Sequence, residues 1–164
     1  MTTNSAWYVL HVKPRTEKKV FDRLCRMNVF RYLPLREKIS RVQRRKVIRH
    51  LPLFPGYVFT RLNADERLEA LKTNYIVRLI DVTQPRQMIH QLRRIAHVGR
   101  LPVDLELIGS FSPGEHVRVK SGPLMGMEGS ILRKGNATSL VLELTILGQA
   151  LAVSVNPADV EKIN

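Results

Sequence analysis

The hydrophobic pattern of this sequence changes near residue 100, and the change restricts the folds that the chain can adopt. Before that point, runs that alternate apolar and polar residues are separated by stretches with helical spacing. Beyond residue 110, short β-prone runs follow one another with Gly- and Pro-containing turns between them. The first pattern predicts a sandwich of one sheet and its helices, and the second predicts a small closed barrel. We therefore expect an α+β chain with domains at 1–100 and 110–164, joined by a linker at 101–109.

Periodicity and turn residues place the individual elements. Alternation predicts strands at 6–12, 32–35, 55–62 and 76–82, and helical spacing predicts helices at 15–28, 63–74 and 84–98. We expect Asp65 to cap the second helix, with Leu68 and Leu71 facing the core. The basic stretch 36–50 fits either a long hairpin or a disordered arm. The strands expected in the C-terminal part are 115–120, 129–133, 140–146, 150–155 and a short tail to Asn164.

Positive charge is concentrated in the N-terminal part of the chain. Residues 1–100 contain 22 Lys and Arg against 7 Asp and Glu, whereas residues 101–164 contain 5 against 7. Solubility does not require such an asymmetry, so it indicates that the N-terminal part faces a polyanion. We favour nucleic acid over an anionic membrane, because the sequence contains no long amphipathic helix with bulky apolar anchors.

Several classes of protein are disfavoured by what the sequence lacks. No apolar run approaches the roughly 20 residues that span a bilayer, and residues 1–6 do not resemble the start of a secretion signal. The single cysteine, Cys25, excludes an internal disulfide, and no Cys/His cluster has zinc spacing. No Ser/His/Asp, Cys/His or paired-carboxylate arrangement stands out. We expect a cytoplasmic, monomeric protein that is not an enzyme and has no catalytic residues, metal ion or cofactor.

Two motifs carry a resemblance to a known family. The segment LFPGYVF at 53–59, preceded in the chain by Trp7-Tyr8-Val9, resembles the N-terminal domain of the NusG family. The segment FSPGEHVRV at 111–119, continuing into GPLMGMEG at 122–129, resembles the KOW motif of the same family. Both occur in the family's order, so the resemblance covers nearly the whole chain. It implies a NusG/RfaH-type factor whose C-terminal barrel is a five-stranded KOW domain.

The resemblance implies a transcription elongation or antitermination factor that acts by contact. Members of the family bind the clamp helices of bacterial RNA polymerase through the N-terminal domain, and the paralogue RfaH also reads the exposed non-template DNA strand. The KOW domain recruits a partner, either a small-subunit ribosomal protein or the termination factor Rho. By motif position, the residues expected to face the polymerase are Trp7, His11, Phe54, Pro55, Tyr57 and Phe59.

The resemblance also divides the basic residues into two groups that would lie near the transcription bubble. At the position of the family's hairpin tip, near the upstream DNA, are Arg41, Arg44, Arg45 and Lys46. A groove for the displaced single strand would be lined by Lys13, Arg15, Lys19, Arg23 and Arg26. In the KOW motif, the glycines expected to form tight turns or close backbone approaches are Gly122, Gly126 and Gly129.

Two departures from the family pattern favour a specialised paralogue over the general factor. The family's hairpin often has a glycine at its tip, where this chain has Val42-Gln43-Arg44, and the helix at 63–74 lacks the His-Thr-Thr-Thr run of RfaH. The alternative is a ribosome-associated or nonspecific nucleic-acid-binding KOW protein. A nonspecific binder would hold naked duplex DNA tightly and ignore polymerase.

Overall fold

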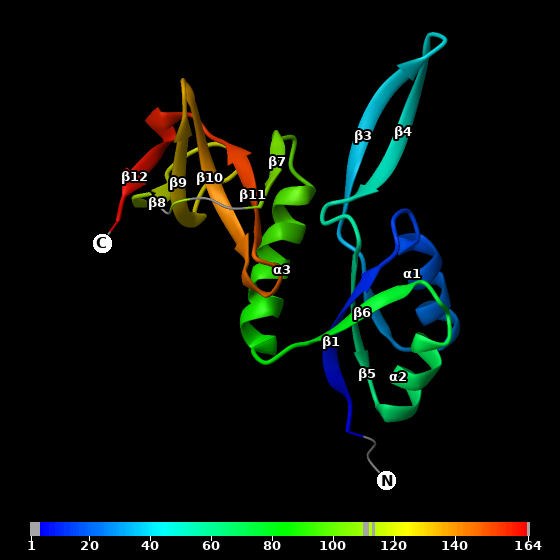
Figure 1. Ribbon diagram of the computed structural model, residues 1–164. Coiled ribbons are helices and arrows are strands. Elements are labelled where there is room, and N and C mark those ends of the chain that lie inside the picture. The colour runs from blue at the N-terminus through cyan, green and yellow to red at the C-terminus, as the bar shows by residue number, and fades with distance from the viewer. Residues whose placement is uncertain (1–3, 110–111, 113, 164) are drawn as a thin grey trace. The chain divides into compact units, whose positions relative to one another are not determined.

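The computed structural model describes residues 4–109, 112 and 114–163, and it falls into two units that divide after Pro85 (Figure 1). The fold is α+β, as expected: a sheet with helices comes first, and a β-rich region follows. Phe111 and Pro113 of the second motif lie outside the described residues. Among the described residues, no helix has both the length and the apolar character needed to cross a bilayer.

The first unit is built on a four-stranded antiparallel sheet. Its strands are β1 (Ala6–Val12), β2 (Phe30–Tyr32), β5 (Tyr57–Leu62) and β6 (Ile76–Asp81), in the order β2-β5-β1-β6. Two helices accompany it, α1 (Glu17–Arg26) and α2 (Ala64–Leu71). Because side chains alternate along a strand, β1 directs Leu10 and Val12 to one face and Trp7, Val9 and His11 to the other.

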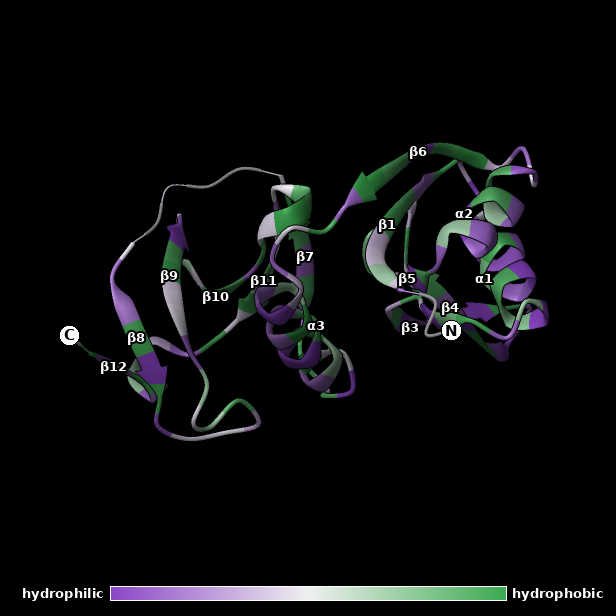
Figure 2. Ribbon diagram, turned by 90° about the horizontal axis from the view of Figure 1, so that it is seen from below, coloured by the Kyte–Doolittle hydropathy of each residue, from purple (hydrophilic) through white to green (hydrophobic). Residues whose placement is uncertain are grey.

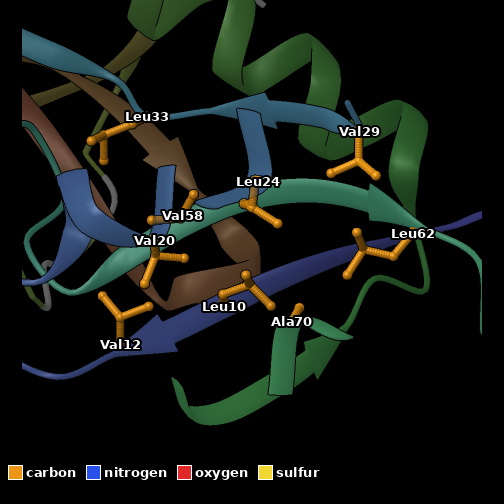
Figure 3. Packing of buried hydrophobic residues seen from close by; sticks show 9 residues of the cluster. All are labelled: Leu10, Val12, Val20, Leu24, Val29, Leu33, Val58, Leu62 and Ala70. Carbon is orange, nitrogen blue, oxygen red and sulfur yellow. The ribbon is translucent and has the colours of Figure 1, made fainter. Parts of the chain in front are cut away.

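Leu10 and Val12 belong to the hydrophobic core between the sheet and the helices (Figure 3). Val20 and Leu24, four residues apart on α1, lie on the same side of that helix and pack against Val58 of β5. Ala70 closes the cluster from α2. This packing fixes the orientation of α1, so the basic residues on its other side are held outward.

The basic stretch forms a hairpin, which decides between the two alternatives left open by the sequence. Strands β3 (Leu35–Val42) and β4 (Arg45–Pro52) make a separate two-stranded sheet that extends away from the four-stranded one (Figure 1). Gln43 and Arg44 join the strands with φ angles of +49° and +67°. A two-residue turn with positive φ at both positions is type I′, a conformation that usually selects Asn and Gly. The turn at the hairpin tip therefore lacks the residues that favour a type I′ conformation.

The second unit contains a helix and a six-stranded antiparallel sheet. Helix α3 (Pro85–Gly99) begins at the unit boundary, and β7 (Leu105–Ile108) follows it. The other strands are β8 (His116–Val119), β9 (Glu128–Lys134), β10 (Ala137–Leu144), β11 (Gln149–Ser154) and β12 (Val160–Lys162), paired in the order β12-β8-β9-β10-β11-β7. Two 3₁₀ turns, Thr145–Leu147 and Pro157–Asp159, precede β11 and β12.

Helix α3 is joined by polar contacts to a 3₁₀ turn and to a strand of its unit. The Gln91 amide donates to Thr145 Oγ1 at 2.9 Å, and Gln91 Oε1 accepts the Thr145 N–H at 3.0 Å. The Arg94 guanidinium donates to the carbonyl of Glu128, and its partial burial lowers the pKa of Arg94, an effect that the nearby Glu128 charge opposes. In the view of Figure 2, the ribbon of α3 carries both hydrophobic and hydrophilic residues.

Three local expectations were wrong. Helix α2 is capped by Asn63, not Asp65: Asn63 Oδ1 accepts the Glu66 N–H at 2.9 Å, and Glu66 Oε2 accepts the Asn63 N–H at 2.7 Å. Leu68 and Leu71 are exposed, because the helix turns the small Ala70 toward the core instead. The stretch 101–109, which lacks clear periodicity and was expected to be a linker, contains β7, which pairs with β11 from Leu105 to Ile108. The domain limits at 1–100 and 110–164 stay a prediction.

Candidate nucleic-acid interface

The motif at 53–59 forms a tight turn before β5. Pro55 and Gly56 occupy its central positions, Gly56 has φ +91°, and the Tyr57 N–H donates to the Phe54 carbonyl at 3.3 Å. Pro followed by a residue of positive φ is the signature of a type II turn, which favours glycine at the second central position. The Gly56 carbonyl in turn accepts the Val12 N–H at 2.8 Å, so the turn is bonded to the end of β1.

A buried carboxylate joins this turn to helix α1. Glu17, in the first turn of α1, is only 8% exposed, and its Oε1 accepts the Gly56 N–H at 2.9 Å. Sequence reasoning missed Glu17. The available signal was an acidic residue at the start of a helix that is otherwise rich in Lys and Arg. Through Glu17 and Gly56, the start of α1, the end of β1 and the start of β5 are held together.

The predicted polymerase-facing residues differ in their accessibility. His11 and Tyr57 lie opposite each other in the β1–β5 register, and their rings stack with centroids 5.0 Å apart. Trp7, on the same face of β1, meets Phe30 edge-on at 4.9 Å. Trp7, His11 and Tyr57 are half-buried and Pro55 is exposed.

Phe54 and Phe59 are different, because both side chains are fully buried. In this structure neither offers surface to a partner. The sequence pattern could not reveal this, since an aromatic residue beside a turn or on a strand can face either the core or the solvent.

A basic groove lies along the outer side of α1. It is lined by Lys19, Asp22, Arg23 and Arg26 from the helix and by Lys72, Thr73 and Tyr75 from the segment after α2. Three of the five residues predicted for a single-strand groove are thus brought together. The other two, Lys13 and Arg15, are exposed on the connection between β1 and α1 and do not line it.

The wall formed by residues 72–75 was not predicted from the sequence. Tyr75 presents an aromatic ring, with Lys19 Nζ 5.6 Å from its centroid. Lys72 binds Glu69 at 2.6 Å, and this hydrogen bond and charge lower the pKa of the Glu69 carboxyl, with a smaller contribution from Arg23 at 3.9 Å. An aromatic face bordered by cations is the combination that holds single-stranded nucleic acid through stacking and phosphate contacts.

The hairpin carries a second, exposed cluster of positive charge. Two pairs of cations lie directly opposite each other across the strands, Lys38 with Arg49 and Arg41 with Lys46. Like charges directly opposite each other destabilise a sheet. The single acid between residues 35 and 52, Glu37, lies 3.5 Å from His50 and neutralises neither pair. The hairpin therefore maintains a charge density that an anionic partner would relieve.

The three KOW glycines have structural explanations. Gly122 and Gly126 have φ of +86° and +88°, where a side chain would be strained. Gly129 is buried in β9, and a Cβ there would lie 2.9 Å from the Val141 carbonyl oxygen and 3.1 Å from a methyl of Leu140. Each of the three is thus required by the local backbone.

The remaining polar side chains of the described residues do not form a metal site. Within residues 4–109, 112 and 114–163, no cluster of three or more His, Cys, Asp or Glu side chains is disposed to hold a metal ion. Cys25, one residue before Arg26 on α1, is exposed with a free thiol. What the site offers is binding surface for an anion.

Comparison with known proteins places this site within a matched region. The sequence profile of the family described as "NusG: Transcription termination factor nusG" matches residues 5–97, which is more than half of the chain. No curated protein matches the sequence. Among solved structures, the one titled "Crystal Structure of MjSpt4:Spt5 complex conformation B" is 14% identical, covers 96% of this chain and 97% of its own, and has a TM-score of 0.30.

Proposed function

This chain belongs to the NusG family of transcription factors, and we propose that it is a specialised elongation and antitermination factor that binds RNA polymerase and the nucleic acid of the transcription bubble. The basic groove of α1 carries the proposal. It combines four cations with the half-buried ring of Tyr75 inside the region matched to the family.

The nucleic-acid part of the proposal uses two surfaces of the first unit. The groove binds the displaced single strand, with Lys19, Arg23 and Arg26 at phosphates and Tyr75 against a base. The hairpin binds upstream duplex through its cations, whose opposed pairs are stabilised when phosphates lie between them. The phosphate contacts on both surfaces are independent of sequence, because phosphates carry no base information.

The polymerase part of the proposal uses the turn at 54–57 and the neighbouring aromatic residues. Pro55 is exposed, and the stacked pair His11–Tyr57 is half-buried, so these side chains form an accessible apolar edge. Aromatic side chains on such an edge commonly supply most of the energy of an interface. Phe54 and Phe59 are buried and do not belong to this edge. The KOW domain would then recruit a second partner, a small-subunit ribosomal protein or Rho.

Single-round transcription with purified bacterial RNA polymerase tests the proposal on the full chain. We expect the wild type to shorten pauses, and the variant Lys19→Ala/Arg23→Ala to do so less. Lys18→Ala is the matched control, since Lys18 is an exposed lysine of α1 that does not line the groove. If wild type and variants all leave elongation unchanged while binding naked duplex DNA tightly, the protein is a nonspecific nucleic-acid binder instead.

A further inference from the structure

The hairpin carries an exposed apolar pair in the middle of its basic surface. Ile39 and Ile48 are cross-strand partners, and they remain 57% and 48% exposed. Such a pair helps to hold two strands together. Its exposure nevertheless leaves apolar area facing water. Threonine at the same two positions would keep the β-branched shape and expose less apolar area.

The two faces of the hairpin are not equivalent. Directly opposed residues share a face, and successive pairs alternate between faces. The face with the isoleucines, called here the isoleucine face, has Arg41 and Lys46 toward the tip and the Glu37–His50 pair toward the base. The opposite face has Lys38 and Arg49 in its middle, the pair Ser40–Val47 beside them and the pair Val42–Arg45 at the tip. Of the two faces of the described hairpin, the isoleucine face alone has a pair of cations at the tip next to an exposed apolar pair.

The spacing of these residues can be compared with the dimensions of duplex DNA. Opposed side chains in a sheet have Cβ atoms about 4.5–5.5 Å apart, and the minor groove is about 6 Å wide. Because the thickness of the side chains adds to the Cβ separation, the isoleucine pair enters the groove only where the duplex is widened and kinked, as inserted apolar side chains make it. Two residues along a strand span roughly 6.6 Å, so Arg41 and Lys46 reach the bordering phosphates when the isoleucines enter the groove. The carboxylate of Glu37 lies on the other side of the isoleucines, away from the tip, which favours an approach to phosphate from the tip alone.

We propose that the hairpin binds duplex DNA with its isoleucine face, inserting Ile39 and Ile48 from the minor groove as a wedge between neighbouring base pairs while Arg41 and Lys46 hold the flanking phosphates. Apolar side chains placed in this way unstack a step and kink the duplex. Binding therefore favours deformable TA and CA/TG steps. The inference rests on the proposed function, in which the hairpin contacts upstream DNA. It adds which face of the hairpin binds, which groove of the DNA it enters and how the apolar side chains are inserted.

Fluorescence of 2-aminopurine beside a central TA step tests the wedge, because the probe brightens when it is unstacked. With the full chain we expect the signal to rise on binding. The variant Ile39→Thr/Ile48→Thr keeps β-branched residues, so the hairpin is preserved, and it should lose most of the increase while affinity falls by no more than about tenfold. Val42→Thr/Val47→Thr makes the same exchange on the opposite face and should leave the signal unchanged.

A second measurement uses the wild-type protein and so does not depend on any variant folding. Replacing adenine by 2,6-diaminopurine at the step places an amino group in the minor groove and leaves the major groove intact. This DNA should bind without being kinked, as followed by energy transfer between dyes at its two ends.

The outcomes separate the wedge from the function on which it rests. If wild type binds the duplex in a manner that needs Arg41 and Lys46, yet neither unstacks nor bends it, the wedge is wrong and the phosphate contact stands. If Arg41→Ala/Lys46→Ala binds duplex as tightly as wild type at every salt concentration, the hairpin is not a DNA contact. Both proposals about it then fail.

Discussion

Glu17 shows how a single side chain sets the position of the candidate interface. Its carboxylate is the partner of the Gly56 N–H and joins the basic helix to the turn that precedes β5. Removing it leaves a backbone donor without this acceptor, at a cost of about 1–3 kcal/mol. We therefore expect Glu17→Ala to lower the free energy of unfolding by that amount in urea denaturation.

The matched control for that change is Asp22→Ala, which removes an exposed acid from the same helix. Its effect should stay within about 0.5 kcal/mol. Equal losses for the two variants would mean that the helix responds to its net charge and not to the bond with Gly56.

Tyr57 and Tyr75 are both tyrosines of the first unit, but they belong to different surfaces. Tyr57 stacks on His11 beside the turn, whereas Tyr75 lines the groove. We expect Tyr57→Ala to weaken polymerase binding about tenfold or more, as loss of an interface anchor does, with little change in affinity for single-stranded DNA. Tyr75→Ala should do the reverse, because stacking on one base contributes about 1–3 kcal/mol. Fluorescence anisotropy with labelled DNA and with core polymerase measures both, and identical effects of the two variants would contradict separate surfaces.

At the scale of elements, the hairpin is the part whose sequence and structure agree least. Its turn has positive φ at Gln43 and Arg44, and each non-glycine residue in that region costs roughly 1 kcal/mol. Exchanging the two for Asn and Gly supplies the residues that a type I′ turn favours. The variant Gln43→Asn/Arg44→Gly should slow amide hydrogen exchange in β3 and β4 several-fold. Unchanged exchange would show that the turn is not where the hairpin opens.

The sequence predicted most elements. It failed where a small residue faces the core and where a strand pairs with a segment far along the chain. The alternation at 6–12 and the spacing at 84–98 correspond closely to β1 and α3 because their apolar residues are large and periodic. The inward position of Ala70 was missed because alanine gives a weak periodic signal beside Leu68 and Leu71. Strand β7 was missed because β11, the strand with which it pairs, lies more than 40 residues later in the chain.

The candidate site was predicted as a set of cations and not as a geometry. Lys19, Arg23 and Arg26 share a side of α1, which helical spacing reveals, but the opposite wall at 72–75 comes from a different element. No local pattern joins such segments, because the fold alone brings them together. For the same reason, the burial of Phe54 could not be predicted from the sequence.

For the whole molecule, the uneven charge predicts how binding responds to salt. The net charge of residues 1–100 is strongly positive and that of residues 101–164 slightly negative, so under the proposed function we expect the first part to supply the DNA affinity. Each phosphate contact contributes about −0.9 to the slope of log K against log salt concentration. Arg41→Ala/Lys46→Ala should therefore reduce the slope by about 2 in filter-binding titrations, whereas Arg118→Ala, on β8 and paired with Glu128 at 2.6 Å, should not change it.

The exposed Cys25 has a practical consequence, because it is the single cysteine of this sequence and lies on α1, the helix that lines the groove. A photoactivatable reagent attached to that sulfur needs no engineered cysteine and no removal of competing ones. Irradiation of the labelled protein in a stalled elongation complex would join it covalently to whatever passes beside α1. Mapping the adduct to a nucleotide would then give the register of the displaced strand along the groove.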